Sequence, residues 1–249
     1  MPKLGHTLVR LEEVGSTNSW VLENESYLDQ HGLVVMARRQ SAGRGRMGRT
    51  WVDLPGNQLF ASTVIHPRTA AADIPVISLI AGLAVASAIA DMLALDARLK
   101  WPNDVLIHGK KVAGILVESK PGAQGAQRLV VGTGVNCQGS TQAAPPELQA
   151  SITTLSQEAG RLVDPETVLH AILERLDGLL ERLAQGRKAE LLVEWARRAR
   201  VVGRWVDWQA PQGQGTGIVQ GISPDGYLVV EDAAGVRHLI VSGQVYWRD

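Results

Sequence analysis

The segment Gln40-Ser41-Ala42-Gly43-Arg44-Gly45-Arg46-Met47-Gly48-Arg49-Thr50-Trp51 holds three glycines and three arginines within seven residues. Glycine allows positive φ and lets a ligand approach the backbone closely. Arginine adds a permanent charge and a planar fork of donors that suits phosphate or carboxylate groups. We interpret the segment as a flexible cationic loop that wraps an anion. The alternatives are a solvated arginine-rich loop and a nucleic-acid contact.

The same glycines match the G-x-G-x-x-G pattern of dinucleotide-binding folds. That pattern requires a strand before it and a helix directly after it. The apolar run Leu33–Ala37 predicts the strand, but residues 51–57 are rich in turn formers and show no helical period. A second apolar run follows at Leu59–Ile65. The order strand, loop, strand argues against a Rossmann site, and the lack of a closing Gly-Lys-Ser/Thr argues against a Walker A loop.

Composition narrows the classes of protein that need to be considered. The 249 residues include 25 basic and 25 acidic side chains, and this balance argues against a dedicated nucleic-acid binder. The single cysteine, Cys137, cannot form an internal disulfide and is interpreted as a small buried thiol. The uncharged run Ile74–Ala90 is short for a membrane span and predicts a buried helix over residues 74–93. The N-terminus has no apolar signal region, so we expect a soluble, cytoplasmic chain.

The pattern up to residue 200 alternates strands and helices. Residues 7–14 predict a strand, and Ser16-Thr17-Asn18 caps a helix that reaches about Glu23. The remaining predicted elements are a hairpin with strands at 105–108 and 111–118 around Gly109-Lys110, a strand at 129–135, a loop at 139–150, and helices at 165–184 and 188–200. This order predicts an α/β (α+β) domain with a mixed sheet and flanking helices.

After about Arg200 the strand-like runs come close together and glycine turns separate them. They lie at 201–208, 217–222, 227–231 and 238–241, with a further run at 244–247. Short strands at this spacing predict a small antiparallel β-barrel. We therefore divide the chain into residues 1–199 and 200–249. Fifty residues form a marginal core, so we expect the second part to pack on the first.

Four motifs occur in order within the first 140 residues. They are Ser16-Thr17-Asn18; Gln40 with the glycine-arginine segment and Trp51; Lys100-Trp101-Pro102-Asn103-Asp104 with Lys111-Val112-Ala113-Gly114-Ile115; and Gly132-Thr133-Gly134-Val135-Asn136. Together they closely resemble the biotin–protein ligases over nearly the whole chain. The resemblance implies a catalytic domain similar to that of class II aminoacyl-tRNA synthetases, followed by the small barrel.

The resemblance also implies the activity. Biotin is activated with Mg-ATP to biotinyl-5′-AMP, and the biotin is then transferred to a lysine of a biotin carboxyl carrier protein of the biotin-dependent carboxylases. Such chemistry needs positive charge beside the reacting phosphate. The resemblance assigns this role first to Lys111 and then to Arg46, with Lys100 adding to the field. Lys110 is interpreted as a solvated neighbour.

The remaining site residues are also assigned by resemblance. For biotin, Ser16, Thr17 and Gln40 face the ureido group or the valerate end, the backbone near Arg44 and Gly45 meets the carboxylate, and Gly114 leaves space for the thiophane ring. The implied biotin site is Ser16, Thr17, Asn18, Gln40, Gly43, Arg44, Gly45, Arg46, Lys111 and Gly114. The implied nucleotide site is Arg46, Arg49, Trp51, Asn103, Lys111 and Asn136, with Asp104 holding either Lys100 or Mg²⁺. Without the resemblance, Ser16-Thr17-Asn18 is a helix cap and Trp51 a core residue.

Bifunctional ligase/repressors of this family carry an N-terminal helix-turn-helix domain. The first motif begins here at residue 16, so we expect the monofunctional type, with no DNA-binding or membrane role. Relatives often form homodimers, but the residues indicate no interface. The alternatives are a lipoate–protein ligase or octanoyl transferase, a non-catalytic biotin-binding module, and a nucleic-acid-binding protein that uses the arginine loop.

Overall fold

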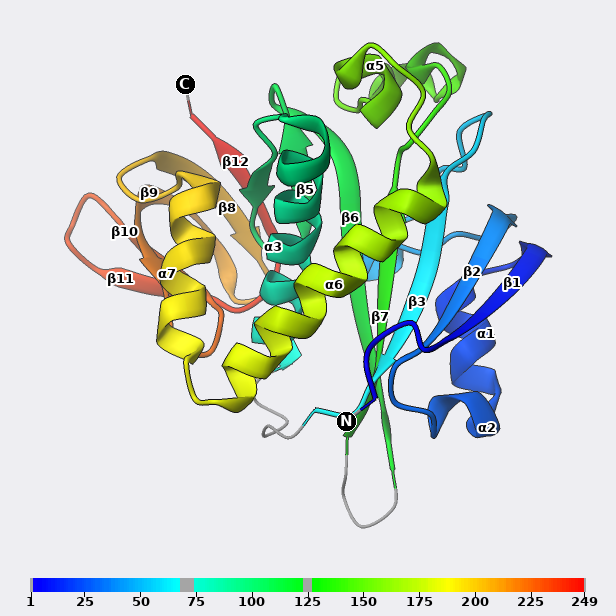
Figure 1. The fold of residues 1–249 in the computed structure, drawn as a ribbon. Helices are drawn as coiled ribbons and strands as arrows, with labels where there is room; N and C mark the ends of the chain where they lie inside the picture. Colours follow the sequence, from blue (N-terminus) through cyan, green and yellow to red (C-terminus); the bar gives the residue numbers. More distant parts are fainter. Residues whose placement is uncertain (1, 68–73, 123–126, 249) are drawn as a thin grey trace.

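The computed structural model describes residues 2–67, 74–122 and 127–248, and its main feature is a seven-stranded mixed sheet (Figure 1). The strand order is β1-β2-β3-β7-β6-β5-β4. The first two strands are parallel and the other pairs are antiparallel. The bounds are β1 Thr7–Val14, β2 Leu33–Gln40, β3 Leu59–Ile65, β4 Arg98–Lys100, β5 Asp104–Ile107, β6 Lys110–Pro121 and β7 Gln127–Val135. The predicted mixed sheet is therefore confirmed.

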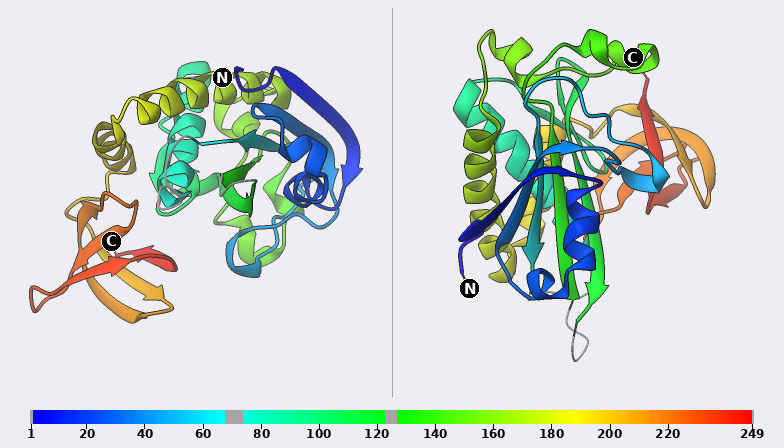
Figure 2. Two further views of the ribbon diagram at one scale, coloured as in Figure 1. Left: turned by 90° about the horizontal axis from the view of Figure 1, so that it is seen from below. Right: turned by 90° about the vertical axis from the view of Figure 1, so that its right-hand side faces the viewer.

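Helices cover both faces of this sheet (Figure 2). One face is covered by α3 (Ile74–Leu93) and α6 (Pro165–Ala184), which pack on each other and on the sheet, with α7 (Lys188–Ala199) beside them. The other face is covered by α1 (Thr17–Glu23), followed by α2 (Glu25–Leu28). The helix α3 has the length and composition of a membrane span, but two thirds of that window (67%) is buried inside the protein. It is the buried core helix that the sequence predicts.

Alternation along the strands divides the core into two apolar clusters. In β2, Leu33 and Val35 pack with Val21 and Leu28 on the α1 side, whereas Val34 joins the larger cluster around α3 and α6. Successive side chains of a strand point to opposite faces, so a strand buried on both faces is continuously apolar. This explains why the predicted runs at 33–37 and 59–65 lack polar alternation.

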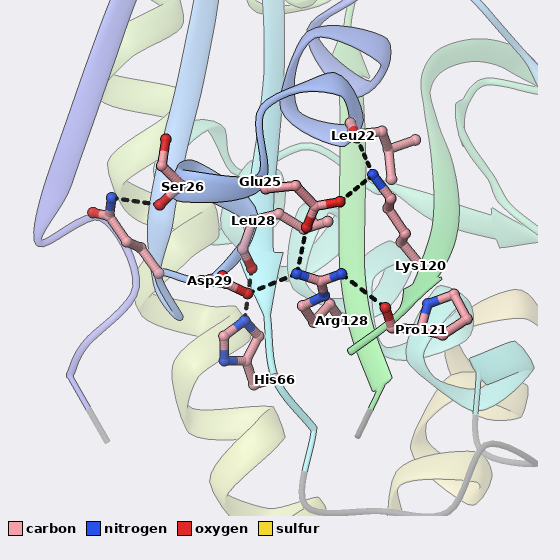
Figure 3. A network of polar contacts seen from close by, with 10 residues as sticks. Leu22, Glu25, Ser26, Leu28, Asp29, His66, Lys120, Pro121 and Arg128 are labelled. Atoms are coloured by element: carbon pink, nitrogen blue, oxygen red, sulfur yellow. Dashed lines mark hydrogen bonds and ion pairs between the residues drawn. The ribbon is translucent and has the colours of Figure 1, made fainter. Parts of the chain in front are cut away.

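Polar contacts tie α2 to the lower ends of β6 and β7 (Figure 3). The Arg128 guanidinium contacts Glu25 and Asp29, each at 2.7 Å, and donates to the Pro121 carbonyl. Lys120 forms an ion pair with Glu25 and donates to the Leu22 carbonyl. These two basic residues lower the pKa of the Glu25 carboxyl. The network fixes the short helices against this end of the sheet.

His31, next to this network, should make the fold sensitive to acid. The Nδ1 atom of His31 accepts a hydrogen bond from the His66 backbone N–H at 3.0 Å, which requires an unprotonated Nδ1. Burial and the neighbouring His66 lower the pKa of His31, although Asp177 opposes the shift. The unfolded chain therefore binds more protons than the folded chain just below pH 6.5, the ordinary histidine pKa. The free energy of unfolding should decrease as the pH falls from there towards the folded pKa.

We expect His31→Asn to weaken this pH dependence, since the asparagine oxygen can still accept the bond and does not titrate. Urea unfolding at pH 7.5 and at pH 5.5 would measure the effect in both proteins. The wild-type chain should lose more unfolding free energy between the two pH values than the variant. An equal loss in the two proteins would show that His31 does not carry the acid sensitivity.

The last fifty residues form a five-stranded antiparallel sheet with the order β11-β10-β9-β8-β12. Its strands are β8 Trp205–Ala210, β9 Gly213–Ile222, β10 Leu228–Glu231, β11 Arg237–Ile240 and β12 Gln244–Trp247. Five strands are confirmed in the predicted order, but the first of them begins at Trp205, four residues later than predicted. β11 and β12 are the two edges of the sheet, so hydrogen bonds do not close it into a barrel. Buried residues of this sheet, including Val219 and Leu228, belong to the same apolar cluster as α3. The buried Trp101 Nε1 donates to the Gly226 carbonyl at 3.1 Å.

Some local predictions need correction. The hairpin turn is formed by His108 and Gly109, both with positive φ, and β6 already begins at Lys110. Residues 139–150 are not entirely loop, because they contain a 3₁₀ turn at Thr141–Ala143 and the short helix α4, Pro146–Gln149. Two further short helices, α2 and α5 (Leu155–Ala159), were not predicted. Each of these is at most five residues long, too short to show a helical period.

Candidate active site

A pocket with a cavity volume of about 130 Å³ lies where the arginine loop meets β3, β6, β7 and the start of α1. Most of the predicted site residues lie together on its wall: Ser16, Thr17, Asn18, Gln40, Arg44, Gly45, Arg46, Arg49, Trp51, Asn103, Asp104, Lys111 and Gly114. Lys100, Gly43 and Asn136 do not line it. Segments separated by nearly a hundred residues thus build one site.

The arginine loop is a compact turn that three backbone hydrogen bonds close. Gly45 N–H donates to the Arg49 carbonyl at 2.7 Å, Arg49 N–H donates to the Arg46 carbonyl at 3.2 Å, and Trp51 N–H donates to the Gly43 carbonyl at 2.9 Å. Met47 has φ 56°, and its side chain is 63% exposed at the tip. Gly43 has no room for a side chain, since a Cβ would lie 2.8 Å from the Trp51 carbonyl oxygen. A ligand carboxylate at the Gly45 amide would have to replace the bond to Arg49.

The indole of Trp51 lies against the backbone of two neighbouring strands. A Cβ at Gly114 would be 2.6 Å from its ring, and a Cβ at Gly134 would be 2.8 Å from it. The space that the sequence analysis reserved for a thiophane ring above Gly114 therefore holds the indole and the end of the Lys111 side chain. The Lys111 ammonium lies 5.1 Å from the centroid of the indole ring, a cation–π distance. Trp51 forms a wall of the site.

Cationic groups gather around the carboxylate of Asp104. Its Oδ1 lies 2.6 Å from the Lys111 Nζ. Burial lowers the pKa of Arg46 and that of Lys100, while the charge of Asp104 opposes both shifts and that of Arg49 adds to them. Among the described residues that line the pocket, Asp104 is the one acidic side chain. Desolvated cations in excess over carboxylates favour the binding of an anion.

Lys100 approaches this group from outside the pocket. Its ammonium lies 5.9 Å from the centroid of the Tyr246 ring in β12, so the side chain extends towards the C-terminal sheet. The effect of Lys111 on the pKa of Lys100 shows that the two ammonium groups are close enough to repel. Lys100 therefore adds positive charge to the site without a place on its wall.

The polar end of the pocket is built on the first turn of α1. Gln40 Oε1 accepts from the Thr17 backbone N–H at 2.8 Å, and Thr17 Oγ1 lies 2.8 Å from Ser62 Oγ. Ser16 occupies the N-cap position, but its side chain makes no capping hydrogen bond. Ser16, Thr17 and Asn18 are at most 6% exposed. The Ser16 hydroxyl is therefore not used to cap the helix.

Two of the predicted nucleotide contacts are engaged within the protein. Asn136 is buried, and its amide donates to the Thr153 carbonyl at 3.1 Å. Asn103 lines the pocket, but its amide donates to the Ile115 carbonyl at 2.7 Å. The first bond holds the 153 segment against the end of β7, and the second holds the turn at 103 against β6. Both residues thus have a structural task that their sequence patterns did not indicate.

Cys137 matches its interpretation as an inert thiol. It is fully buried, and burial raises its pKa to about 12. The thiolate is the reactive form of cysteine, so this residue is no nucleophile near neutral pH.

The sequence analysis missed several pocket residues that bring no charge. They include Phe60 and Ala61 of β3, Leu116 of β6 and Thr133 of β7. Phe60 and Ala61 lie in an apolar run that is typical of any buried strand. The motif Gly132-Thr133-Gly134 could have indicated close backbone contact, because a Cβ at Gly132 would lie 2.5 Å from Asn18 Oδ1.

Sequence comparison identifies the family. Residues 12–136 match the family model described as "Biotin/lipoate A/B protein ligase family". Residues 203–248 match the model described as "Biotin protein ligase C terminal domain". The chain therefore belongs to the biotin/lipoate protein ligase family.

Individual relatives agree with this membership. The chain is 37% identical to the biotin–[acetyl-CoA-carboxylase] ligase of Paracoccus denitrificans, over 86% of this chain and 89% of that protein. It is 29% identical to the bifunctional ligase/repressor BirA of Bacillus subtilis, over 95% of this chain and 73% of that protein. The biotin protein ligase from Aquifex aeolicus, solved with biotin and ATP, superposes with a TM-score of 0.84 and 29% identity, covering 98% and 99% of the two chains.

Proposed function

We propose that the protein activates biotin with Mg-ATP to biotinyl-5′-AMP and transfers the biotin to a lysine of a biotin carboxyl carrier protein. The observation that carries this proposal is the arrangement of Lys111, Arg46 and Arg49 around a narrow slot with a polar end. Membership in the family and the likeness to a ligase solved with biotin and ATP support it.

In the first half-reaction, a carboxylate oxygen of biotin attacks the α-phosphorus of ATP, and pyrophosphate leaves. Negative charge builds up on the phosphoryl oxygens, and the enzyme must neutralise it. Lys111 is held by Asp104 and by the Trp51 ring, so its charge is already in place before the substrate arrives. Arg46 extends from the loop on the other side, and Lys100 adds to the field from behind.

In the second half-reaction, the carrier lysine attacks the carbonyl carbon of the mixed anhydride and AMP leaves. An amide bond forms, and the attacking nitrogen loses a proton. Water must be kept from the anhydride until the carrier arrives. We propose that the arginine loop closes over the adenylate for this purpose, with Arg46 as the cation that holds the phosphate. Arg49 and Trp51 are proposed to bound the nucleotide, with Asn103 and Asn136 fixing the backbone around it.

Biotin combines an apolar body with a polar ureido ring and so needs an apolar slot with a few fixed polar groups. We propose that Ser16, Thr17 and Gln40 face its polar part and that the backbone near Arg44 meets its carboxylate. Lipoate has no ureido ring to satisfy these polar groups. The match of residues 203–248 to the biotin ligase C-terminal model favours biotin over lipoate.

A magnesium ion fits the donor set only in part. The described residues contain no cluster of three or more His, Cys, Asp or Glu side chains that could hold a metal. Mg²⁺ usually binds through one or two carboxylates together with substrate phosphates, and Asp104 is a carboxylate in the right place. We propose that Asp104 and the phosphates share the ion, which would neutralise phosphate charge.

We also propose that residues 1–199 form the catalytic domain and residues 200–249 a C-terminal domain that closes its edge. The carrier of a biotin-dependent carboxylase is the proposed partner, in line with the name of the Paracoccus relative. Cytoplasmic localisation remains a prediction. The lack of a DNA-binding role also remains one, and the neutral charge of the chain agrees with it. A homodimer also remains a prediction.

The test is pyrophosphate release from Mg-ATP with biotin or with lipoate as the acid. We expect release with biotin and little with lipoate, followed by amide formation on an added carrier domain. Release with lipoate alone would favour a lipoate ligase. If a folded protein bound biotin but released no pyrophosphate, it would be a binding module instead.

A further inference from the structure

Glu118, in the last third of β6, uses both carboxylate oxygens to hold two different parts of the site. Its Oε1 lies 2.7 Å from a terminal nitrogen of Arg44 in the arginine loop. Its Oε2 accepts from the Asn18 side-chain amide at 2.9 Å. The other terminal nitrogen of Arg44 donates to Ser19 Oγ at 3.0 Å. One carboxylate therefore joins the loop to the first turn of α1.

The hydrogen bonds of Asn18 run in one direction. Its amide nitrogen donates to Glu118 and to the Leu116 carbonyl, which leaves Oδ1 as a pure acceptor. Ser62 Oγ lies 2.6 Å from that oxygen and 2.8 Å from Thr17 Oγ1. Since a serine hydroxyl has one proton and the Asn18 oxygen only accepts, Ser62 donates to Asn18. Thr17 Oγ1 lies 2.8 Å from Ser62 Oγ and 3.2 Å from Gln40 Oε1, so its single proton goes to one of these two oxygens. The contacts Thr17–Ser62–Asn18–Glu118 thereby connect the polar end of the slot to the loop.

We propose that Glu118 is a positioning residue that couples occupancy of the slot to closure of the arginine loop. The identity of the ligand as biotin rests on the proposed function. The role of Glu118 in holding the loop does not. A ligand that fixes Thr17 fixes the chain of contacts behind it and so keeps the Glu118 carboxylate turned towards Arg44. Asn18 serves this chain instead of contacting the ligand, because each of its polar groups already has a protein partner.

Glutamine cannot replace the carboxylate in this role. Glu118 receives donors on both oxygens, from Arg44 and from Asn18. Glutamine has one acceptor oxygen and one amide donor, so one of the two bonds must become a contact between donors. The side chain of Glu118 is 20% exposed and that of Arg44 is 47% exposed, so the ion pair is partly screened. The change is isosteric and leaves the backbone of β6 intact.

The experiment measures the loop with and without ligand. Hydrogen exchange at the Gly45, Arg49 and Trp51 amides, which close the loop, reports its opening. In Glu118→Gln we expect these amides to exchange about fivefold faster, the size of a good partly exposed ion pair. Biotin dissociation should also speed up about fivefold, while the rate of adenylate formation at saturating biotin stays within about twofold of wild type.

A double-mutant cycle separates positioning from a general loss of stability. Arg44→Met removes the partner but keeps the length of the side chain, and it should raise loop exchange as Glu118→Gln does. In the Arg44→Met background, Glu118→Gln should have little further effect on the loop amides. Fully additive effects would overturn the proposal, as would unchanged exchange in Glu118→Gln.

Glu12→Gln is the matched control, because Glu12 forms an exposed ion pair with Arg38 at 3.8 Å, away from the loop. Its loop exchange should equal that of wild type, and an equal rise there would overturn the proposal. The exchange of the free protein does not depend on any ligand. If the chain failed to bind biotin, the proposed function would fail, and the exchange data would still decide whether Glu118 holds the loop.

Discussion

Replacing Lys111 with alanine should reduce biotin-dependent pyrophosphate release at least about a hundredfold, the usual loss when one charged donor to a transition state is removed. The ammonium is held between Asp104, at 2.6 Å, and the Trp51 ring. It is therefore oriented before the phosphate gains charge. Stopped-flow or steady-state pyrophosphate release at saturating biotin and ATP would measure the change.

The control is Lys110→Ala, one residue earlier in the same strand. Lys110 is absent from the described pocket lining and should tolerate the change with activity within about threefold of wild type, as is normal for surface positions. Circular dichroism would establish that both variants are folded. Full activity in Lys111→Ala would remove this residue from the mechanism, and equal losses in both variants would indicate damage to the hairpin.

Replacing Arg46 with glycine should let the adenylate escape and acylate bystander lysines. Burial lowers the pKa of this guanidinium, which indicates poor solvation in the protein and favours an anionic partner. Removing a charge-assisted bond costs about 1.5–3 kcal/mol, so adenylate release should rise about tenfold or more. Biotin incorporated into an unrelated bystander protein, detected by mass spectrometry, would be the readout.

Glycine also adds flexibility to the loop, so the control must separate the two effects. Met47→Gly adds the same backbone freedom without removing a charge, and Met47 already has a φ of 56° that glycine adopts freely. This variant should label only the carrier. If Arg46→Gly still labelled only the carrier, Arg46 would not retain the adenylate. If Met47→Gly also labelled bystander proteins, the stiffness of the loop would retain the adenylate instead of the charge of Arg46.

Much of the fold could be predicted because its elements have clear local signals. The strand at Leu59–Ile65 and the helix from Pro165 match the predicted bounds, since an apolar run and an Asp-Pro cap define them without tertiary help. The short helices at 146–149 and 155–159 could not be found in this way. They are four and five residues long, too short to show a helical period, although Thr154 caps the second of them.

The sequence was sufficient to predict which residues lie at the site. It was not sufficient to predict what each of them contacts. Motif residues lie together because the order of the strands brings β3, β6 and β7 side by side. Which amides face inward depends on partners far along the chain, as with Asn136 and Thr153. Glu118 gave no signal, because a glutamate in a strand is usually a solvated residue. Its partners Asn18 and Arg44 lie 100 and 74 residues away in the sequence.

The shared core of the two sheets limits how the chain can be divided by an engineer. The sheet after residue 200 buries Val219 and Leu228 in the same cluster as α3, and Trp101 reaches across to the Gly226 carbonyl. A cut between residues 199 and 200 would leave apolar surface on both halves. As separate fragments, each half would therefore tend to aggregate unless the two were produced together. A split reporter or a transplanted catalytic module should therefore not be cut at residue 199. The boundary between the two sheets in the sequence is not a boundary between two parts that fold separately.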